Sequence, residues 1–395
     1  MTTLGNSTLW RGAAMVAAVA AFGFIGAGDA RAQAACTTQV TAGLRFPMGI
    51  VQTNQRQLLV SEAGDRGVLH SGRISIVSTD GARRTLVDGL PSATNDAGDP
   101  GGPAGLLMRG RTLYVAMSIG DTILPVGATP VRIGNPAPAS RLFSSVLAMH
   151  FSANAERTTP GFSLSPADEE SLADGKTVRL SDGAGNKLTI EVVANFPDYI
   201  PNPTPAAPDN VRGSNPFDVE LIGDQLFVTD GGRNHVWKTD IHTGAFEPLA
   251  SFPTIANPTP VGAPVIEAVP TGIREFEGQL FVTLFRGFPF APGTSVVEQI
   301  DPVSGAHAPL VSNLRTAIDV LFADEGEHAA PVILQHASGA LLPPFSGPGS
   351  LTRLDGGVAT VLANCLGRPT SMVRDDHTGA FYITELVGGR VVMVP

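Results

Sequence analysis

The chain has few lysines, few cysteines and few long apolar runs, and each scarcity excludes a class of protein. Only three lysines occur, Lys176, Lys187 and Lys238, and no Lys/Arg cluster of the kind that grips a phosphate backbone is present. Acidic residues outnumber basic ones by 36 to 26. We therefore expect no nucleic-acid partner, and an acidic surface that either keeps the protein soluble or attracts cations.

Cysteine occurs only twice, as Cys36 and Cys365. Neither has a histidine or a second cysteine at metal-ligand spacing, which argues against a thiolate metal site. In an oxidising compartment an even number of cysteines permits a disulfide, and this one would join the two ends of the mature chain.

One apolar run stands out, at residues 13–27, followed by the small-x-small triplet Ala30-Arg31-Ala32. This order predicts a secretory signal peptide over residues 1–32. The alternative, a single membrane anchor, would need the ~20 apolar residues that span a bilayer. Because no later run is long enough, we expect a secreted or periplasmic protein with no membrane span after cleavage.

Glycine and proline are abundant, at 45 and 32 residues, while helix-period patterning is nearly absent. Short alternating runs separated by turn residues are typical of an all-β sandwich, barrel or propeller. Here the runs recur as a unit, in which a leading tripeptide and an apolar run are followed by a gap and a second apolar run. The six leading tripeptides are Pro47-Met48-Gly49, Pro103-Ala104-Gly105, Asn215-Pro216-Phe217, Pro270-Thr271-Gly272, Thr316-Ala317-Ile318 and Pro369-Thr370-Ser371.

The later units start at positions 216, 270, 316 and 369, which are 54, 46 and 53 residues apart. This spacing is close to the ~40–50 residues of a four-stranded propeller blade. The sequence therefore predicts a single all-β domain, residues 36–395, folded as a six-bladed β-propeller. A seven-bladed ring is the alternative, because 112 residues separate the starts at positions 103 and 215.

The two irregular regions of the repeat have separate explanations. The last unit ends at Pro395 after three runs, so we expect residues 37–42 to supply its fourth strand and close the ring. That pairing would bring Cys36 beside Cys365 for a disulfide. Within the long interval, a helix start at Ser165 and a hairpin pattern predict a helix-plus-hairpin insertion in the second blade, at about residues 158–203.

Antiparallel pairing places the start of each first strand and the end of each second strand at one rim of the ring. The position two residues after each second run is occupied by Glu62, Met117, Asp230, Leu284, His336 and Glu385. Carboxylates gathered there need neutralising charges, either a cation or an arginine such as Arg212, Arg274 or Arg286. One interpretation is a Ca²⁺ or Mg²⁺ site whose oxygen ligands are Glu62, Asn215, Asp230 and Glu385. The other is that each carboxylate accepts backbone amides and locks neighbouring blades together.

The stretch "FRGFPFAPG", residues 285–293, places three phenylalanines around one arginine in a loop at the same rim. These rings either fill the channel mouth or receive an apolar, planar ligand. The ligand-binding candidates at the rim are Arg274, Phe285, Arg286, Phe288, Phe290 and His336.

Several stretches resemble the ScyD/ScyE family of secreted propellers, named for proteins associated with synthesis of the pigment scytonemin. They are "LPSATNDAGDPGGPAGL", "SNPFDVELIGDQLFVTDGGRNHVWKTD", "VPTGIREFEGQLFVTLFRGFPFAPGTSVVEQID", "AIDVLFA" and "PTSM", and they extend over nearly the whole mature chain. The rest of the pattern is shared with NHL repeats and gluconolactonase-like enzymes. The resemblance implies an exported propeller and no established catalytic residues.

Two functions fit these patterns. The first is an exported, monomeric scaffold that binds a small molecule or a protein at the channel rim. The second is a lactonase- or lyase-like enzyme, in which a rim-bound Ca²⁺ or Mg²⁺ polarises a carbonyl and Glu62 or Glu385 moves the proton.

Overall fold

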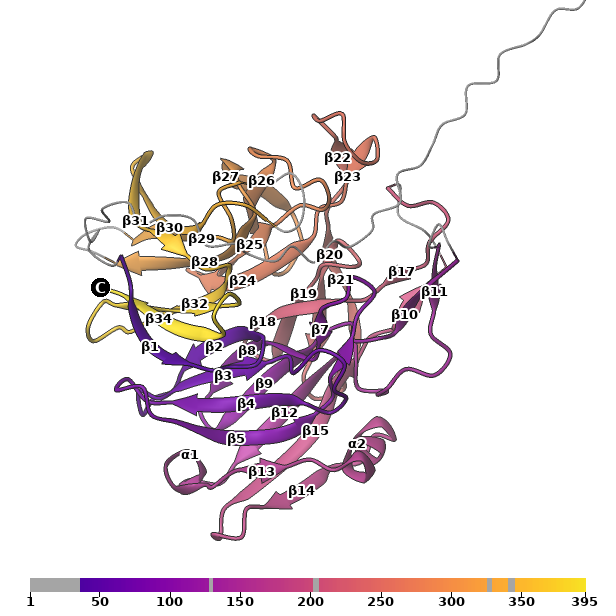
Figure 1. Ribbon diagram of the computed structural model, residues 1–395, viewed down its shortest axis with the longest axis vertical. Coiled ribbons are helices and arrows are strands. Elements are labelled where there is room, and N and C mark those ends of the chain that lie inside the picture. The colour runs from indigo at the N-terminus through magenta and orange to yellow at the C-terminus, as the bar shows by residue number, and fades with distance from the viewer. Residues whose placement is uncertain (1–35, 128–130, 202–205, 325–328, 340–344) are drawn as a thin grey trace, which may run out of the picture.

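The computed structural model describes residues 36–127, 131–201, 206–324, 329–339 and 345–395. The predicted signal peptide, residues 1–32, lies outside the described residues. Within them the chain forms six blades around a common axis, each built on four antiparallel strands, and a fifth strand is added in blades 1 and 2 (Figure 1). The predicted six-bladed β-propeller is confirmed, and the seven-bladed alternative is not.

The blades are numbered in chain order, and the innermost strand of each is named first. Blade 1 contains β2 (Pro47–Gln52), β3 (Leu58–Glu62), β4 (Gly72–Val77) and β5 (Arg83–Leu90). Blade 2 contains β8 (Pro103–Arg109), β9 (Thr112–Met117), β12 (Ser145–Phe151) and β15 (Lys187–Asn195). Blade 3 contains β18 (Pro216–Ile222), β19 (Gln225–Asp230), β20 (His235–Asp240) and β21 (Phe246–Ser251).

The remaining blades follow the same order. Blade 4 contains β24 (Pro270–Phe276), β25 (Gln279–Leu284), β26 (Ser295–Ile300) and β27 (His307–Leu314). Blade 5 contains β28 (Ala317–Asp324), β29 (Ala329–Gln335), β30 (Gly349–Asp355) and β31 (Val358–Leu366). Blade 6 contains β32 (Pro369–Arg374), β33 (Phe381–Glu385), β34 (Arg390–Val394) and, from the other end of the chain, β1 (Thr38–Ala42).

The innermost strands contact each other in a closed cycle, β2, β8, β18, β24, β28, β32 and back to β2. The second strands are almost entirely buried, and the residues between the blades form the apolar core. The ring is closed by pairing of β1 with β34, as predicted, and Figure 1 shows the two strands side by side. A disulfide joins Cys36, just before β1, to Cys365 in β31 of the preceding blade. Both ends of the described chain are thus fixed to the same part of the ring.

Three of the six leading tripeptides carry glycine, where the innermost strands approach very closely. A Cβ atom on Gly105 would lie 2.4 Å from the Cα atom of Asp218, and one on Gly272 would lie 2.8 Å from the Cα atom of Asp319. Real side chains do not fit at such distances. The glycines of blades 2 and 4 therefore make room for the backbone of the next blade, and the channel between the strands is narrow.

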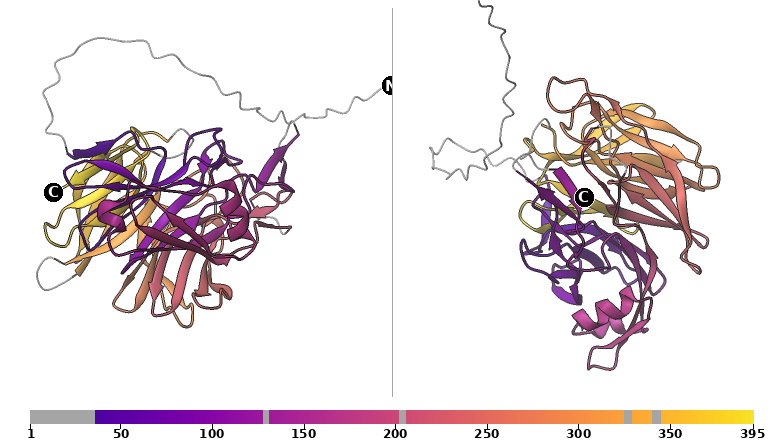
Figure 2. Two further views of the ribbon diagram at one scale, coloured as in Figure 1. Left: turned by 90° about the horizontal axis from the view of Figure 1, so that it is seen from below. Right: turned by 90° about the vertical axis from the view of Figure 1, so that its right-hand side faces the viewer.

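The insertion is a helix and a hairpin, as predicted. Helix α2 (Pro166–Ala173) begins with a capping box, in which the Ser165 side chain accepts a hydrogen bond from the Asp168 amide. Strand β14 (Val178–Ser181) pairs with β15, so the hairpin extends blade 2 to five strands. The short strand β13 (Phe162–Ser163) also pairs in parallel with β5, which the sequence pattern does not predict. Figure 1 and the right-hand view of Figure 2 place α2 at the periphery of the ring, so the insertion joins blades 1 and 2 on their outer side.

Four small hairpins and one short helix complete the described structure. The hairpins are β6 (Ala93–Thr94) with β7 (Pro100–Gly101), β10 (Ile123–Val126) with β11 (Val131–Gly134), β16 (Tyr199–Ile200) with β17 (Arg212–Gly213), and β22 (Ile255–Ala256) with β23 (Val265–Ile266). Helix α1 (Ala155–Thr158) follows β12. Among the described residues, no helix has the length and apolarity that crossing a bilayer requires.

Candidate functional site

The rim predicted from the repeat exists, because the equivalent positions all lie at the ends of second strands. Glu62, Met117, Asp230, Leu284 and Glu385 are the last residues of their strands, and His336 follows β29 by one residue. All six are buried. The residue at this position makes different contacts in different blades.

The three rim carboxylates each accept a hydrogen bond from the backbone that leads into the first strand of their own blade. Glu62 accepts from the Arg45 amide at 2.6 Å, Asp230 from the Asn215 amide at 2.8 Å, and Glu385 from the Gly367 amide at 2.7 Å. These carboxylates therefore fasten the incoming chain to the end of the second strand.

Their other oxygens are also occupied by protein groups. Asp230 accepts from the Ser214 hydroxyl at 2.6 Å and from the Trp237 indole at 3.0 Å. Glu62 accepts from the Ser75 hydroxyl, and Glu385 pairs with Arg390. Of the two interpretations of the rim carboxylates, these contacts match the one in which each carboxylate accepts hydrogen bonds from backbone amides. The amides, however, belong to the same blade as the carboxylate and not to a neighbouring blade.

The predicted cation site, Glu62, Asn215, Asp230 and Glu385, is not assembled as one cluster. Within the described residues, no group of three or more His, Cys, Asp or Glu side chains is arranged to hold a metal ion. Asn215 adjoins Asp230, but its side-chain oxygen accepts from the Ile119 amide at 3.2 Å. Binding of Ca²⁺ or Mg²⁺ by these residues stays a prediction.

Arg274, a predicted ligand-binding residue, lies in the channel between blades 3, 4 and 5. Its guanidinium pairs with Asp218 of β18 and, at 2.8 Å, with Asp319 of β28. Burial alone would lower the pKa of Arg274, but the two carboxylates outweigh it and raise that pKa. Asp319 also accepts from the Met372 amide of blade 6 at 2.9 Å. Arg274 therefore links four blades and does not face the rim.

A cleft of about 770 Å³ lies at the rim, over blades 2, 3 and 4. Its walls come from the loops after β19 and β25, from the segments that lead into β18 and β24, and from the hairpins β6/β7, β10/β11 and β16/β17. Four of the six predicted ligand-binding residues line it, Phe285, Arg286, Phe288 and Phe290. Asn215 lines it as well.

Among the described residues that line this cleft five are charged, and four of them form two ion pairs. The Arg132 guanidinium contacts Asp96, and the Arg212 guanidinium lies 3.5 Å from Glu267. Arg212 thus neutralises Glu267, and not one of the three carboxylates at the strand ends. The fifth charge belongs to Arg286, for which the described residues provide no ion pair.

Arg286 is 6% exposed and is held from both its backbone and its side chain. Its amide donates to the Ala268 carbonyl at 3.0 Å, and its Nε donates to the Thr294 carbonyl at 2.9 Å. Its φ of 73° is in the left-handed region, a conformation that non-glycine residues adopt at a cost and often at functional sites. Burial lowers the pKa of Arg286, while the charge of Glu298 opposes that shift. The guanidinium is thus fixed and poorly solvated.

Aromatic rings form the wall behind Arg286. Phe290 packs edge-to-face against Phe285, with ring centroids 5.9 Å apart, and against Phe345 at 4.7 Å. Phe288 is 40% exposed and contacts Phe290 with its edge. The predicted alternatives for these rings are therefore combined, since the inner rings fill space and Phe288 remains accessible.

His336 lies behind this wall and does not line the cleft. Its ring contacts Phe285 and Phe345 with centroids 5.7 and 5.2 Å away, and its Nδ1 is 2.9 Å from the Pro369 carbonyl oxygen. Burial lowers the pKa of His336 to about 4. It is neutral at pH 7 and supports the aromatic wall, so its predicted contact with a ligand would be indirect.

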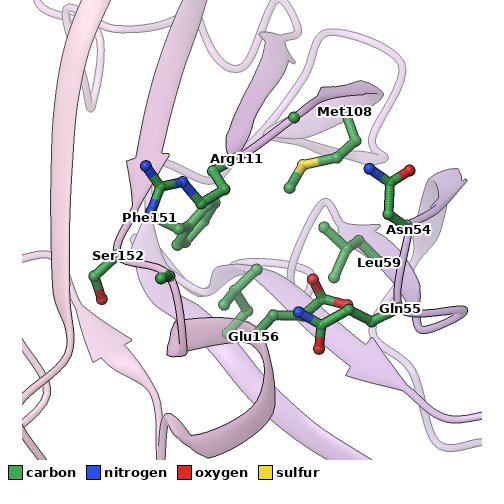
Figure 3. Close-up of a pocket in the computed structure, with 11 residues that line it drawn as sticks. Asn54, Gln55, Leu59, Met108, Arg111, Phe151, Ser152 and Glu156 are labelled. Atoms are coloured by element: carbon green, nitrogen blue, oxygen red, sulfur yellow. The ribbon is translucent and has the colours of Figure 1, made fainter.

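A second cavity, of about 150 Å³, lies between blades 1 and 2 (Figure 3). Its floor includes Leu59, Met108 and Phe151, and Arg111 and Glu156 flank it. The Glu156 carboxylate accepts a hydrogen bond from the Thr53 hydroxyl, and its raised pKa is caused by burial. This cavity is several times smaller than the rim cleft and has none of the predicted site residues.

Sequence reasoning missed Arg132, Asn234 and Glu267, which also line the rim cleft. Glu267 precedes the first strand of blade 4 and accepts from the Asn234 side chain and from the Ala206 amide. Its position three residues before the leading tripeptide could have been noticed, because other residues that precede the first strands were already expected at this rim. Arg132 comes from a hairpin outside the repeat, for which the pattern gives no signal.

No family model matches the chain, and no match was found among curated proteins. Solved structures with a similar fold include a gluconolactonase from Xanthomonas campestris, 12% identical, with 90% of this chain and 88% of that chain covered and a TM-score of 0.48. A glucose dehydrogenase is 14% identical, with 91% and 99% covered and a TM-score of 0.49. A sialidase from Trypanosoma rangeli is 10% identical, with 91% and 57% covered and a TM-score of 0.46. Likeness this distant, to proteins of different activities, supports no argument about function.

Proposed function

We propose that this protein is an exported binding propeller of the ScyD/ScyE type, which receives a small, planar and largely apolar molecule in its rim cleft. The observation that carries the proposal is the cleft itself, about 770 Å³ in volume and lined by Phe288, Phe290 and Arg286. Pockets for small molecules have volumes of roughly 300–1,000 Å³ and combine apolar walls with a few placed polar groups.

The loop that carries these residues is held in place before any ligand arrives. The amides of Phe285, Arg286 and Gly287 donate in succession to the carbonyls of Val269, Ala268 and Glu267, each at 3.0 Å. A prearranged wall avoids the entropic cost of ordering a loop on binding. Export is supported by the disulfide between Cys36 and Cys365, because disulfides persist in oxidising compartments.

The enzymatic alternative, a metal-dependent lactonase or lyase, needs a rim-bound cation and a carboxylate free to move a proton. Glu62 and Glu385, the carboxylates predicted for that role, are fully buried and accept hydrogen bonds from protein groups. The contacts at the rim favour binding over this chemistry.

Binding in the rim cleft can be tested with N-phenyl-1-naphthylamine, a neutral aromatic probe whose fluorescence rises in apolar surroundings. We expect saturable binding to the wild-type protein and a loss of roughly 0.5–1.5 kcal/mol, up to about tenfold in affinity, in Phe288→Ala. Leu69→Ala is the matched control, since Leu69 is an exposed apolar residue, 52% exposed, that does not line the cleft. Equal affinities in all three proteins would contradict the proposed function.

A further inference from the structure

We propose that the molecule received by the rim cleft carries one carboxylate, and that Arg286 binds it. This inference rests on the proposed function and adds the chemical class of the ligand. Three observations support it, namely the charge of Arg286, the hydrogen-bonding capacity of its guanidinium and the aromatic residues that line the same cleft.

The charge of the cleft is unbalanced by one positive unit. Arg132 with Asp96 and Arg212 with Glu267 cancel in pairs, whereas Arg286 has no ion-pair partner among the described residues. Glu298 acts on Arg286 only at longer range and is itself 3.1 Å from the His307 ring nitrogen. An uncompensated buried charge is costly unless a bound group of opposite sign supplies the partner. The whole chain has a net charge of −10, so an arginine without an ion pair among the described lining residues of the cleft is locally distinctive.

The hydrogen-bonding capacity of the guanidinium points in the same direction. Nε is already used, since it donates to the Thr294 carbonyl at 2.9 Å. No hydrogen bond joins the two terminal nitrogens to another described residue, and Arg286 is one of the residues that line the cleft. These two nitrogens form a planar pair of donors, whose geometry matches the two oxygens of a carboxylate.

A monoanion fits better than a phosphate dianion. The imbalance is one charge, and the described lining residues, which include Phe285, Phe288 and Phe290, offer no second cation without an ion pair. Phosphate sites typically add backbone amides or further cations to a single arginine. An aromatic or conjugated ring attached to the carboxylate would contact Phe288, which is 40% exposed.

The test uses two probes of the same shape and different charge, naphthalene-2-carboxylate and naphthalene-2-carboxamide, measured by titration calorimetry. We expect the wild-type protein to bind the carboxylate at least roughly tenfold more tightly than the amide, as charge-assisted hydrogen bonds are about twice as strong as neutral ones. In Arg286→Gln this preference should disappear, and in Arg286→Lys part of it should remain.

Arg111→Gln is the matched control, because Arg111 borders the other cavity beside Phe151 (Figure 3) and should leave both affinities unchanged. Equal affinities of the wild-type protein for the two probes would overturn the carboxylate proposal and leave the rim-cleft function standing. Binding of neither probe at millimolar concentration would overturn both. The comparison of probes on the wild-type protein needs no variant, so the proposal stays testable even if Arg286→Gln does not fold.

Discussion

Two arginines of blade 4 differ in how their charge is balanced. Arg274, in the first strand, lies between Asp218 and Asp319 in the narrow channel. Arg286, just after the second strand, has no ion pair with a described residue and borders a cleft of about 770 Å³. Arg274 is paired with two carboxylates of the protein. Arg286 is held in position through Nε, and its two terminal nitrogens donate to no other described residue.

The comparison shows how a propeller separates structure from binding. In the channel the innermost strands come so close that a charge must be neutralised by neighbouring blades. At the rim the chain turns back, loops diverge, and a charged side chain can face a space that protein atoms do not fill. Arginine therefore joins neighbouring blades in the channel, and at the rim it is available to bind a ligand.

The largest expected effect is a difference in the free energy of unfolding between variants of these two arginines. Arg274→Met should lower the free energy of unfolding by roughly 3–5 kcal/mol, because it leaves two buried carboxylates without their partner. Arg286→Gln should cost less, roughly 1–2 kcal/mol, since it loses the Nε bond to the Thr294 carbonyl but no ion pair. Urea unfolding of the two variants and the wild-type protein measures both values. Equal losses would show that the two sites do not differ as argued.

A smaller effect concerns the support behind the rim wall. The folded pKa of His336 is about 4, against 6.5 for an ordinary histidine, because burial disfavours its charged form. Between these pH values the unfolded chain takes up a proton that the folded chain excludes, so the free energy of unfolding falls as the pH is lowered. The loss should be about 3 kcal/mol by pH 4.

His336→Asn, which keeps a donor for the Pro369 carbonyl, should remove this part of the acid sensitivity. His235, whose pKa burial also lowers to about 4, should still contribute its own part. Urea unfolding at pH 7.5 and pH 4.5 gives the measurement. An unchanged difference between the two pH values in His336→Asn would refute the assignment to His336.

The smallest expected effect on stability concerns the rim carboxylates, which pair with backbone amides and side chains and not, like the channel carboxylates, with Arg274. Glu62→Gln keeps most of the shape but weakens the bonds from the Arg45 amide and the Ser75 hydroxyl, which should cost roughly 1–3 kcal/mol. We expect calcium and magnesium contents, measured by elemental analysis, to be the same in wild type, in Glu62→Gln and in the matched Asp230→Asn. Metal that is bound by the wild-type protein and lost from both variants would instead support the predicted cation site.

Much of the ring could be predicted from local sequence. The leading tripeptides mark, to within one residue, where each first strand begins. In blades 2 and 4 their glycines, at positions 105 and 272, let the next blade approach. The pairing of β1 with β34 and the disulfide followed from the missing fourth strand of the last unit. The exception is β13, which pairs with blade 1 although it lies within the insertion of blade 2. Its two residues are too few for a pattern.

The candidate site was predicted less completely. The loop from Phe285 to Phe290 was recognised, because three aromatic rings around an arginine are unusual in a turn. Arg274 was predicted at the rim, and the structure pairs it with Asp218 and Asp319. The sequence does not show that these two carboxylates occupy the positions that glycine occupies in blades 2 and 4. Arg132 could not have been found, because its hairpin lies outside the repeat.

The sequence by itself determined the number of blades, the closure of the ring and the rim to which the strand ends belong, since these follow from the period of the repeat and the alternation of strand direction. Only the tertiary structure decided which charges cancel. Ion pairing depends on distances of a few ångströms between residues that are far apart in the chain, such as Arg274 and Asp319 at 2.8 Å, and on the absence of such a partner for Arg286 among the described residues. The period of the repeat does not determine which of these ion pairs form.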